Sequence, residues 1–325
     1  MMWSADMLRK ICCPMCKSSE LMLENGGTLL NGISGSAGIR CKICGRTYAY
    51  ERGILDMRPD SLRFGNVDPG WERWQGHQSE YQDREQTLWN KERAERGKKL
   101  YDRFFEFADI EQGCVLDVGG WRGISRHWVR DVRYVVVDPY RECAVVRQDF
   151  MSDLYPCLLQ PMPFLWGVGE FLPVISCCFD YVLNMSTLDH VLSPYTVLVE
   201  SWRVLKDRGS LLLFVQTKKS RVVQASSHRS KSWILQEMIT RGQFREIIRT
   251  FGRIAKKAFA WTGRATFIKG VVDTMTSQDH HMNQFSRVDL EQLLEAANFH
   301  IIQSEYHESL KVFFAKCCKK RIMYR

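Results

Sequence analysis

The stretch from Cys114 to Gly123, which reads CVLDVGGWRG, constrains the fold of this chain most strongly. A short apolar run ends in Asp117, the chain then turns through glycines, and a helix-like pattern resumes from Ile124 to Val129. This order predicts a buried strand, a tight loop and the start of a helix. Because backbone amides at a helix N-terminus favour an anionic or carboxylate-bearing ligand, we expect a ligand site at this loop.

Apolar strand segments alternate with helical segments through the chain after Gly113. The expected strands are 115–118, 134–137, 164–167, 180–184 and 210–216, and a helix is expected at 195–205. This alternation predicts an α/β fold with a doubly wound, mostly parallel sheet that has helices on both faces. Ligands of such sheets bind outside the carboxyl ends of the strands.

Asp138 ends the second expected strand, 21 residues after Asp117. An acid at this place can accept hydrogen bonds from both hydroxyls of a ribose. A nicotinamide dehydrogenase needs the fingerprint G-x-G-x-x-G, which the glycines at 119, 120 and 123 do not supply, so that class is disfavoured. The alternative for Asp138, and for Glu170 further on, is a solvated acid at a strand end.

Two Cys-x-x-Cys pairs, Cys13 with Cys16 and Cys41 with Cys44, are separated by a Gly- and Ser-rich spacer. Four thiolates at this spacing can form a tetrahedral zinc site, and zinc binding would stabilise a segment too small to bury its own core. The alternative is two pairs of ordinary buried cysteines. Cys12 leaves the register of the first pair ambiguous.

Composition limits where the chain works and what it binds. Twelve cysteines without a secretory signal at the start of the sequence favour a reducing compartment, so we expect a cytoplasmic protein. No apolar run approaches the roughly 18 residues of a membrane-spanning helix. The net charge of +9 is concentrated between 218 and 270, where thirteen Lys or Arg residues face two Glu.

Six segments in order resemble class I S-adenosylmethionine-dependent methyltransferases, best the small-molecule subgroup. They are DVGGWRG at 117–123, VVDP at 136–139, GEFLP at 169–173 with FDYV at 179–182, LDHVLSP at 188–194, ESWRVLK at 200–206, and the late segment around DHH at 279–281 and 285–299. The resemblance implies a seven-stranded Rossmann-like sheet and S-adenosylmethionine as cofactor.

The resemblance also implies residue roles. The backbone at Gly119, Gly120 and Gly123 would approach the methionine part of the cofactor, and Asp117 would orient its amino group. Asp138 would hold the ribose and the segment of Gly169 and Glu170 would lie by the adenine. Asn184 would lie near the carboxylate or the sulfonium. Two positions depart from the family pattern: Trp121 replaces a glycine, and Val168 replaces an acid that contacts adenine.

Residues 1–60 resemble the zinc-ribbon family of small methyltransferase-activator proteins, including their closing pattern around Gly53-Ile54-Leu55. This resemblance implies structural Zn²⁺ at the four cysteines and a module that docks on a protein, either its own domain or a partner. We therefore divide the chain into a zinc ribbon (1–60), a connector and lid helix (61–110) and a methyltransferase domain (111–325).

A helical cap inserted at about 218–275 carries the basic charge. Its apolar residues recur at helical spacing opposite Arg245, Arg249 and Arg253. Three interpretations remain open: a cap packed on the domain, a peripheral membrane-surface helix, and, less favoured, a nucleic-acid-binding surface.

The expected function is methyl transfer to a small-molecule, glycan or lipid-linked acceptor. His281 is the candidate general base for a hydroxyl acceptor, because histidine titrates near neutral pH. The alternatives are an RNA methyltransferase and a non-catalytic scaffold that retains the fold.

Overall fold

The computed structural model describes residues 3–24, 36–62, 76, 90–129, 131–217 and 283–320. The expected cap at 218–275 and the candidate base His281 lie outside these residues. Within them, no helix is long and apolar enough to cross a membrane.

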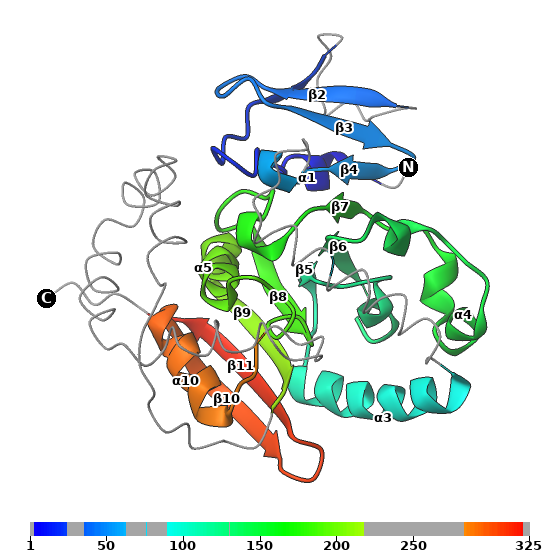
Figure 1. The fold of residues 1–325 in the computed structure, drawn as a ribbon, viewed down its shortest axis with the longest axis vertical. Coiled ribbons are helices and arrows are strands. Elements are labelled where there is room, and N and C mark those ends of the chain that lie inside the picture. The colour runs from blue at the N-terminus through cyan, green and yellow to red at the C-terminus, as the bar shows by residue number, and fades with distance from the viewer. Residues whose placement is uncertain are drawn as a thin grey trace, which may run out of the picture.

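One sheet of eleven strands runs through the described residues in the order β1-β2-β3-β4-β7-β6-β5-β8-β9-β11-β10 (Figure 1). The strands are β1 (Leu21–Leu23), β2 (Ala37–Cys41), β3 (Thr47–Glu51), β4 (Ile54–Asp56), β5 (Gly113–Val118), β6 (Val132–Asp138), β7 (Phe164–Trp166), β8 (Phe179–Met185), β9 (Leu205–Gln216), β10 (Phe299–His307) and β11 (Val312–Lys319). The expectation of seven strands is therefore too small. Seven strands, in the order β7-β6-β5-β8-β9-β11-β10, correspond to the expected sheet. The four strands β1 to β4 of the N-terminal unit extend the sheet beyond β7.

Helices cover both faces of the sheet, as the alternation predicts. The α-helices are α1 (Ala5–Leu8), α3 (Lys91–Ala108), α4 (Phe150–Leu154), α5 (Pro194–Val204) and α10 (Arg287–Ala296). Short 3-10 helices are η2 (Asp60–Leu62), η3 (Ile124–His127), η4 (Arg141–Ala144), η5 (Pro156–Leu159) and η6 (Gly169–Phe171). One apolar core joins α5 and α10 to the sheet, and a second joins α3 to its other face.

The helix α3 is a layer of the core. Asn90 caps its start by accepting a hydrogen bond from the Arg93 amide at 2.9 Å. Phe104 is fully buried, with its ring centroid 5.7 Å from that of Phe214 and 5.3 Å from that of Phe314. The sequence predicts an exposed connector or a lid here; the packing of Phe104 makes the second half of α3 a structural part of the domain.

The N-terminal unit joins the sheet through a parallel pairing of β4 with β7. Ile54 lies opposite Phe164 and Leu55 opposite Leu165, and the Met57 amide donates to the Trp166 carbonyl at 2.9 Å. The unit therefore docks on the domain that follows it in the same chain, and its sheet and the central sheet are continuous (Figure 1).

The strands β3 and β4 of the N-terminal unit form a hairpin. Arg52 and Gly53 have φ of 51° and 87°, and the chain reverses there so that β4 pairs antiparallel with β3. Glycine adopts this left-handed conformation without steric cost. That reversal places β4 beside β7.

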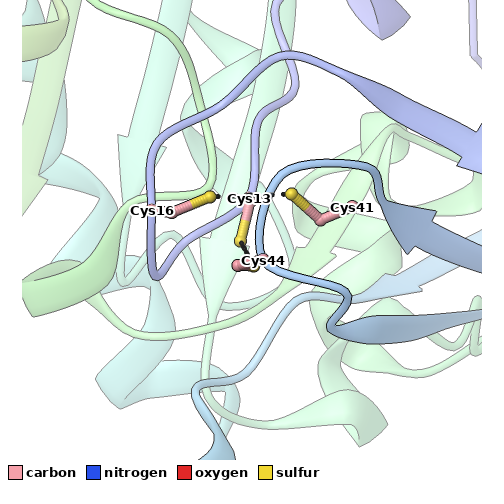
Figure 2. Close-up of side chains that lie close together, drawn as sticks. All are labelled: Cys13, Cys16, Cys41 and Cys44. Atoms are coloured by element: carbon pink, nitrogen blue, oxygen red, sulfur yellow. Dashed lines mark hydrogen bonds between the residues drawn. The ribbon is translucent and has the colours of Figure 1, made fainter.

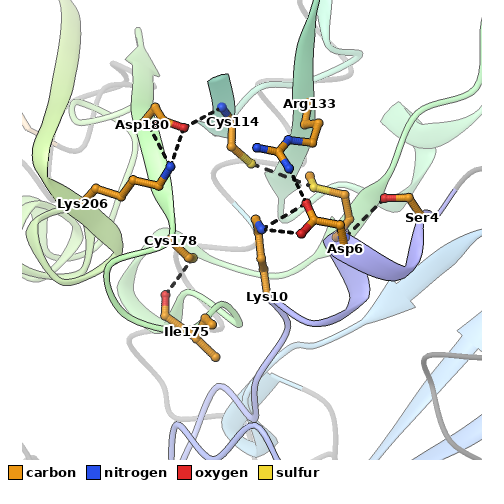
Figure 3. Close-up of polar contacts among 10 residues, drawn as sticks. Ser4, Asp6, Lys10, Cys114, Arg133, Ile175, Cys178, Asp180 and Lys206 are labelled. Carbon is orange, nitrogen blue, oxygen red and sulfur yellow. Dashed lines mark hydrogen bonds and ion pairs between the residues drawn. The ribbon is translucent and has the colours of Figure 1, made fainter. Parts of the chain in front are cut away.

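A polar cluster at the amino ends of the strands anchors α1 (Figure 3). Asp6 of α1 forms ion pairs with Lys10 at 3.1 Å and with Arg133 of β6 at 2.7 Å. Nearby, Asp180 accepts from the Cys114 amide at 2.9 Å and pairs with Lys206 at 2.8 Å. These contacts tie the start of the chain to β6, and β5 to β8.

A second ionic contact links the first cysteine pair to α5. Lys17 donates to Glu200 at 2.6 Å and to the Leu172 carbonyl at 3.2 Å. Arg203 binds the same carboxylate through two nitrogens, at 2.7 and 2.8 Å. Burial of Glu200 opposes its ionisation, but the charges of Lys17 and Arg203 outweigh this and lower its pKa to about 2.

We predict that Lys17→Met lowers the free energy of unfolding by about 1–2 kcal/mol, because Glu200 loses one of two cationic partners in a buried place. A carboxyl with a depressed pKa stabilises the fold above its unfolded value and loses that contribution as the pH falls. Acid unfolding of the variant should therefore begin at a higher pH. Urea melts across pH 2–7, with the exposed Lys42→Met as control, test this; equal curves for both variants would contradict it.

Candidate cofactor cleft and metal centre

Four cysteine sulfurs gather between two loops of the N-terminal unit (Figure 2). The ligand atoms of Cys13, Cys16, Cys41 and Cys44 all lie within 4.8 Å of one another. Two cross pairs, Cys13 with Cys44 and Cys16 with Cys41, are each 3.6 Å apart. A tetrahedral zinc ion with Zn–S bonds of about 2.3 Å separates its sulfurs by about 3.8 Å. The four residues fit Zn²⁺, and Cys12 is not one of them.

The surroundings of the cluster shift its thiol pKa values in both directions, and burial raises those of Cys13 and Cys16. The Tyr48 hydroxyl lies 3.0 Å from the Cys13 sulfur. Burial opposes ionisation of Cys44, but hydrogen bonds from the Arg46 backbone and side chain outweigh it and lower the pKa of Cys44 to about 7. With four cysteine ligands no coordination position is left for a reacting water, so the metal would be structural.

We predict about one zinc per chain in the purified protein. Cys13→Ser should lose the metal and lower the melting temperature, whereas Cys12→Ser should keep it, because only Cys13 belongs to the cluster. Elemental analysis and thermal melts with and without a chelator measure both effects. Equal zinc contents of the two variants would refute this assignment.

The loop after β5 sits directly on the strand ends. Gly119, Trp121 and Gly123 have φ of 71°, 48° and 71°. A Cβ on Gly119 would lie 2.3 Å from the Thr187 hydroxyl oxygen, and the Gly119 amide donates to the Val137 carbonyl at 2.8 Å. Glycine at 119 is therefore required both by conformation and by space.

Asp138, the last residue of β6, fixes this loop through a hydrogen bond from a loop amide. Its two oxygens accept from the Trp121 amide at 2.8 Å and the Tyr140 amide at 2.9 Å. The side chain is only 4% exposed, and burial raises the pKa of Asp138 to about 7 although the two amides act against it. A carboxylate can accept about four hydrogen bonds, so two of its lone-pair directions remain for a ligand.

Asp117 and Asn184 leave buried polar atoms without a partner among the described residues. Asp117 accepts from the Tyr134 hydroxyl through Oδ2, while Oδ1 makes no hydrogen bond. Both amide atoms of Asn184, at the end of β8, are also without a partner and the residue is 0% exposed. Burial raises the pKa of Asp117 to about 6, against the hydrogen bonds from Tyr134 and Ser125. Buried polar atoms normally have partners, so these three atoms fit a polar ligand.

Glu170 is directed into the protein. Its Oε1 accepts from the amides of Leu192 and Ser193 at 2.9 and 3.1 Å, which fixes the start of α5. Burial raises the pKa of Glu170 to about 7. Gly169 is close-packed, since a Cβ there would lie 3.0 Å from a Val118 methyl. An adenine contact at 169 and 170 stays a prediction.

The side chain of Trp121 is partly buried and packs against apolar residues of the domain. It lies against an apolar cluster that includes Ala94 of α3 and Met151 of α4, and its ring centroid is 5.4 Å from the Arg122 guanidinium. The ring also packs against the larger apolar core that contains Phe104 and Tyr134. The Trp121 amide serves the loop by donating to Asp138.

Sequence reasoning missed Tyr134 and Ser125, which lie beside Asp117. The signal was available in β6: residues 134, 136 and 138 alternate onto one face of the sheet, the face to which Asp138 belongs. Tyr134 is thus the only one of these three that carries a hydroxyl toward the neighbouring strand end.

We predict that Trp121→Gly lowers the free energy of unfolding by about 1–3 kcal/mol, because lost packing exceeds the relief of a positive φ. Its effect on cofactor affinity should be within about threefold, since the amide that binds Asp138 remains. Calorimetry with S-adenosylhomocysteine, beside urea melts, measures both. A tenfold loss of affinity at unchanged stability would mean that the ring touches the ligand.

Residues 89–304, about two thirds of the chain, match a family model described as a methyltransferase domain. No curated protein matches the sequence.

Solved structures with similar folds include three from different organisms. The PH0226 protein of Pyrococcus horikoshii OT3 is 16% identical, with 71% of this chain and 92% of that chain covered at a TM-score of 0.44. The YcgJ protein of Bacillus subtilis is 14% identical (68% and 97%, TM-score 0.41). A 1,6-didemethyltoxoflavin-N1-methyltransferase of Burkholderia thailandensis, with its substrate and S-adenosylhomocysteine bound, is 13% identical (70% and 84%, TM-score 0.40). Similarity at this level carries no argument about the acceptor.

Proposed function

The chain belongs to the methyltransferase-domain family and is an S-adenosylmethionine-dependent methyltransferase, and from this premise we propose that its acceptor is a small molecule, a glycan or a lipid-linked compound. The observation that carries this proposal is the sequence and packing of residues 184–187 at the end of β8.

We assign the cofactor to the carboxyl ends of β5, β6 and β8, where Asp117, Asp138 and Asn184 lie. Asp117 and Asn184 would receive the amino-acid part, because their partnerless atoms include both acceptors and donors. Asp138 would accept from the ribose hydroxyls with the lone pairs that its two amide partners leave. The glycines at 119 and 123 allow the loop backbone to lie close to a ligand, where a side chain would intrude.

S-adenosylmethionine supplies a methyl group already activated by a positively charged sulfur. The chain's own task is then mainly to orient the two reactants and to exclude water. The carboxylates of Asp117 and Asp138 are 1% and 4% exposed, so their charges act in a place of low dielectric, where electrostatic interactions are strong.

The end of β8 argues against a base-modifying RNA enzyme. Enzymes that methylate exocyclic base amines are expected to have an Asn-Pro-Pro-Tyr-like motif here, and this chain has Asn184-Met185-Ser186-Thr187. Asn184 is fully buried, and the Thr187 hydroxyl donates to the carbonyls of Val118 and Met185 at 3.1 and 3.0 Å. Because Asn184 is assigned to the cofactor and the Thr187 hydroxyl is taken by these carbonyls, neither side chain is left for a nucleobase amine.

RNA remains the second candidate on one observation, the local charge of the segment 218–270, where thirteen basic residues face two acidic ones. The same charge suits an anionic lipid surface or a phosphorylated lipid-linked acceptor. For a hydroxyl acceptor we assign the general base to His281, which is two residues before Asn283 in the sequence and lies outside the described residues.

We predict that the protein binds S-adenosylhomocysteine at micromolar concentrations and that Asp138→Asn weakens this at least tenfold, because one acceptor oxygen is lost. The exposed Asp153→Asn, on α4, should bind normally. Absence of binding by the wild-type protein in calorimetry would favour a non-catalytic scaffold.

The acceptor class is tested by transfer of labelled methyl groups from S-adenosylmethionine into a fractionated cell extract. We expect the label in the organic-soluble or small-molecule fraction, and little in RNA. Label that appears chiefly in RNA, and that is lost when Arg245, Arg249 and Arg253 are replaced by Glu, would overturn the proposed acceptor class.

A further inference from the structure

The carboxylate of Asp117 is held from two sides. On one side the Tyr134 hydroxyl of β6 donates to Oδ2. On the other lies the loop backbone at Gly120, where an added Cβ would be only 2.6 Å from the Asp117 carboxyl carbon. A side chain at 120 would displace the carboxylate, so glycine there and tyrosine at 134 together fix one orientation of Asp117.

This orientation divides the two oxygens between different tasks. Oδ2 is taken by Tyr134, and Oδ1 is buried without a partner among the described residues. Leaving a buried carboxylate oxygen without a partner costs free energy unless a ligand supplies one. The geometry therefore presents Oδ1 as an acceptor, and a cationic donor such as an ammonium group is the complementary ligand.

We propose that Tyr134 is a positioning residue for the cofactor: its hydroxyl fixes Asp117 so that Oδ1 receives the ammonium group of the amino-acid part. Ser125 of η3, at the start of the segment that follows the loop, supports the same arrangement, since it hydrogen-bonds in this cluster and its hydroxyl also lies 3.5 Å from the Met185 sulfur. The proposal rests on the cofactor assignment made above.

A set of polar groups surrounds Asp117 and must be considered in any pH experiment. They are Tyr134 of β6, Ser125 of η3, Tyr101 of α3 and Asp138 at the end of β6. Burial, and then the charge of Asp117, raises the pKa of both tyrosines, so they stay protonated and can donate near neutral pH. Arg126 is near enough to act on Tyr134 but is held by the carbonyls of Cys157 and Gln160.

The carboxyl groups of Asp117 and Asp138 both titrate within an accessible pH range, and both pKa values are raised. Burial raises the pKa of Asp117 to about 6 and that of Asp138 to about 7. A cationic ligand group needs Asp117 ionised, so affinity should fall as the pH drops through 6. Removal of the Tyr134 hydroxyl takes away a hydrogen bond that lowers the pKa of Asp117, so the loss should begin at a higher pH.

The test compares two ligands that share the adenosine part. S-adenosylhomocysteine carries the ammonium group, and 5′-methylthioadenosine lacks the whole amino-acid part but keeps the ribose that Asp138 would bind. We expect Tyr134→Phe to weaken S-adenosylhomocysteine about tenfold at pH 7.5 and to leave methylthioadenosine within twofold. Any pH dependence common to both ligands reports Asp138, and the difference between them reports Asp117.

Two further variants complete the design. Tyr155→Phe removes the hydroxyl of another buried tyrosine, whose ring packs on His127 and Trp128, and should change neither affinity. In Asp117→Asn the additional Tyr134→Phe change should have little further effect, because the two residues act as one unit.

Equal weakening of both ligands by Tyr134→Phe would overturn the positioning role and indicate a general structural one. Additive effects of the two changes would also overturn it. Failure of the wild-type protein to bind either ligand would instead refute the cofactor assignment itself, so the two failures are distinguishable.

Discussion

The parallel pairing of β4 with β7 joins the sheet of the N-terminal unit to the central sheet. It is only three residues long on each strand, yet it places the four-cysteine cluster of the N-terminal unit and the candidate cofactor site on one continuous sheet. The amide of Met57 extends it by one bond to Trp166. The segment from Lys10 to Lys17 contacts the same domain at two further places. Ile11 forms an isolated β-bridge with Val174, and Lys17 forms an ion pair with Glu200 of α5.

The carboxylates at the candidate cofactor site are tightly held by their neighbours. Asp138 and Glu170 each bind two backbone amides, and Asp117 is wedged between a tyrosine hydroxyl and the backbone at Gly120. Carboxylates in such places are expensive to ionise, which is why burial raises the pKa of all three. Ligand-binding sites often retain buried ionisable groups of this kind, although such groups lower the stability of the fold.

Much of this was accessible from the sequence. Apolar periodicity predicts β5, β6, β8 and β9 to within a few residues, except that β9 begins five residues earlier, and it predicts α5 closely. The spacing of the two cysteine pairs predicts the cluster that the structure assembles. The glycine at 119 and the acids at 117 and 138 do lie together at the strand ends, because parallel strands bring their carboxyl ends to one edge.

What the sequence could not give depends on contacts between distant segments. Both arms of the hairpin at Arg52 and Gly53 are β-prone, so apolar periodicity does not separate β3 from β4, and the pairing of β4 with β7 depends on a distant segment. Trp121 departs from the family pattern, but where its ring packs depends on α3 and α4. The role of Tyr134 follows from the register of β6 against β5, in which Tyr134 lies opposite Val115 and two residues before the level of Asp117.

The pairing of β4 with β7 also decides how the sheet ends. In the described chain its outer strands are β1, of three residues, and β10, of nine. An open strand edge offers unpaired backbone groups to any other extended chain, and short or irregular edges limit this. The apolar β7, with Phe164 and Leu165 buried, is thus kept inside the sheet, while the edge passes to β1. At the opposite end, β10 is interrupted by a register shift between Ile301 and Gln303 and carries Glu305. In the described chain the N-terminal unit therefore covers the edge of β7 that would otherwise be open.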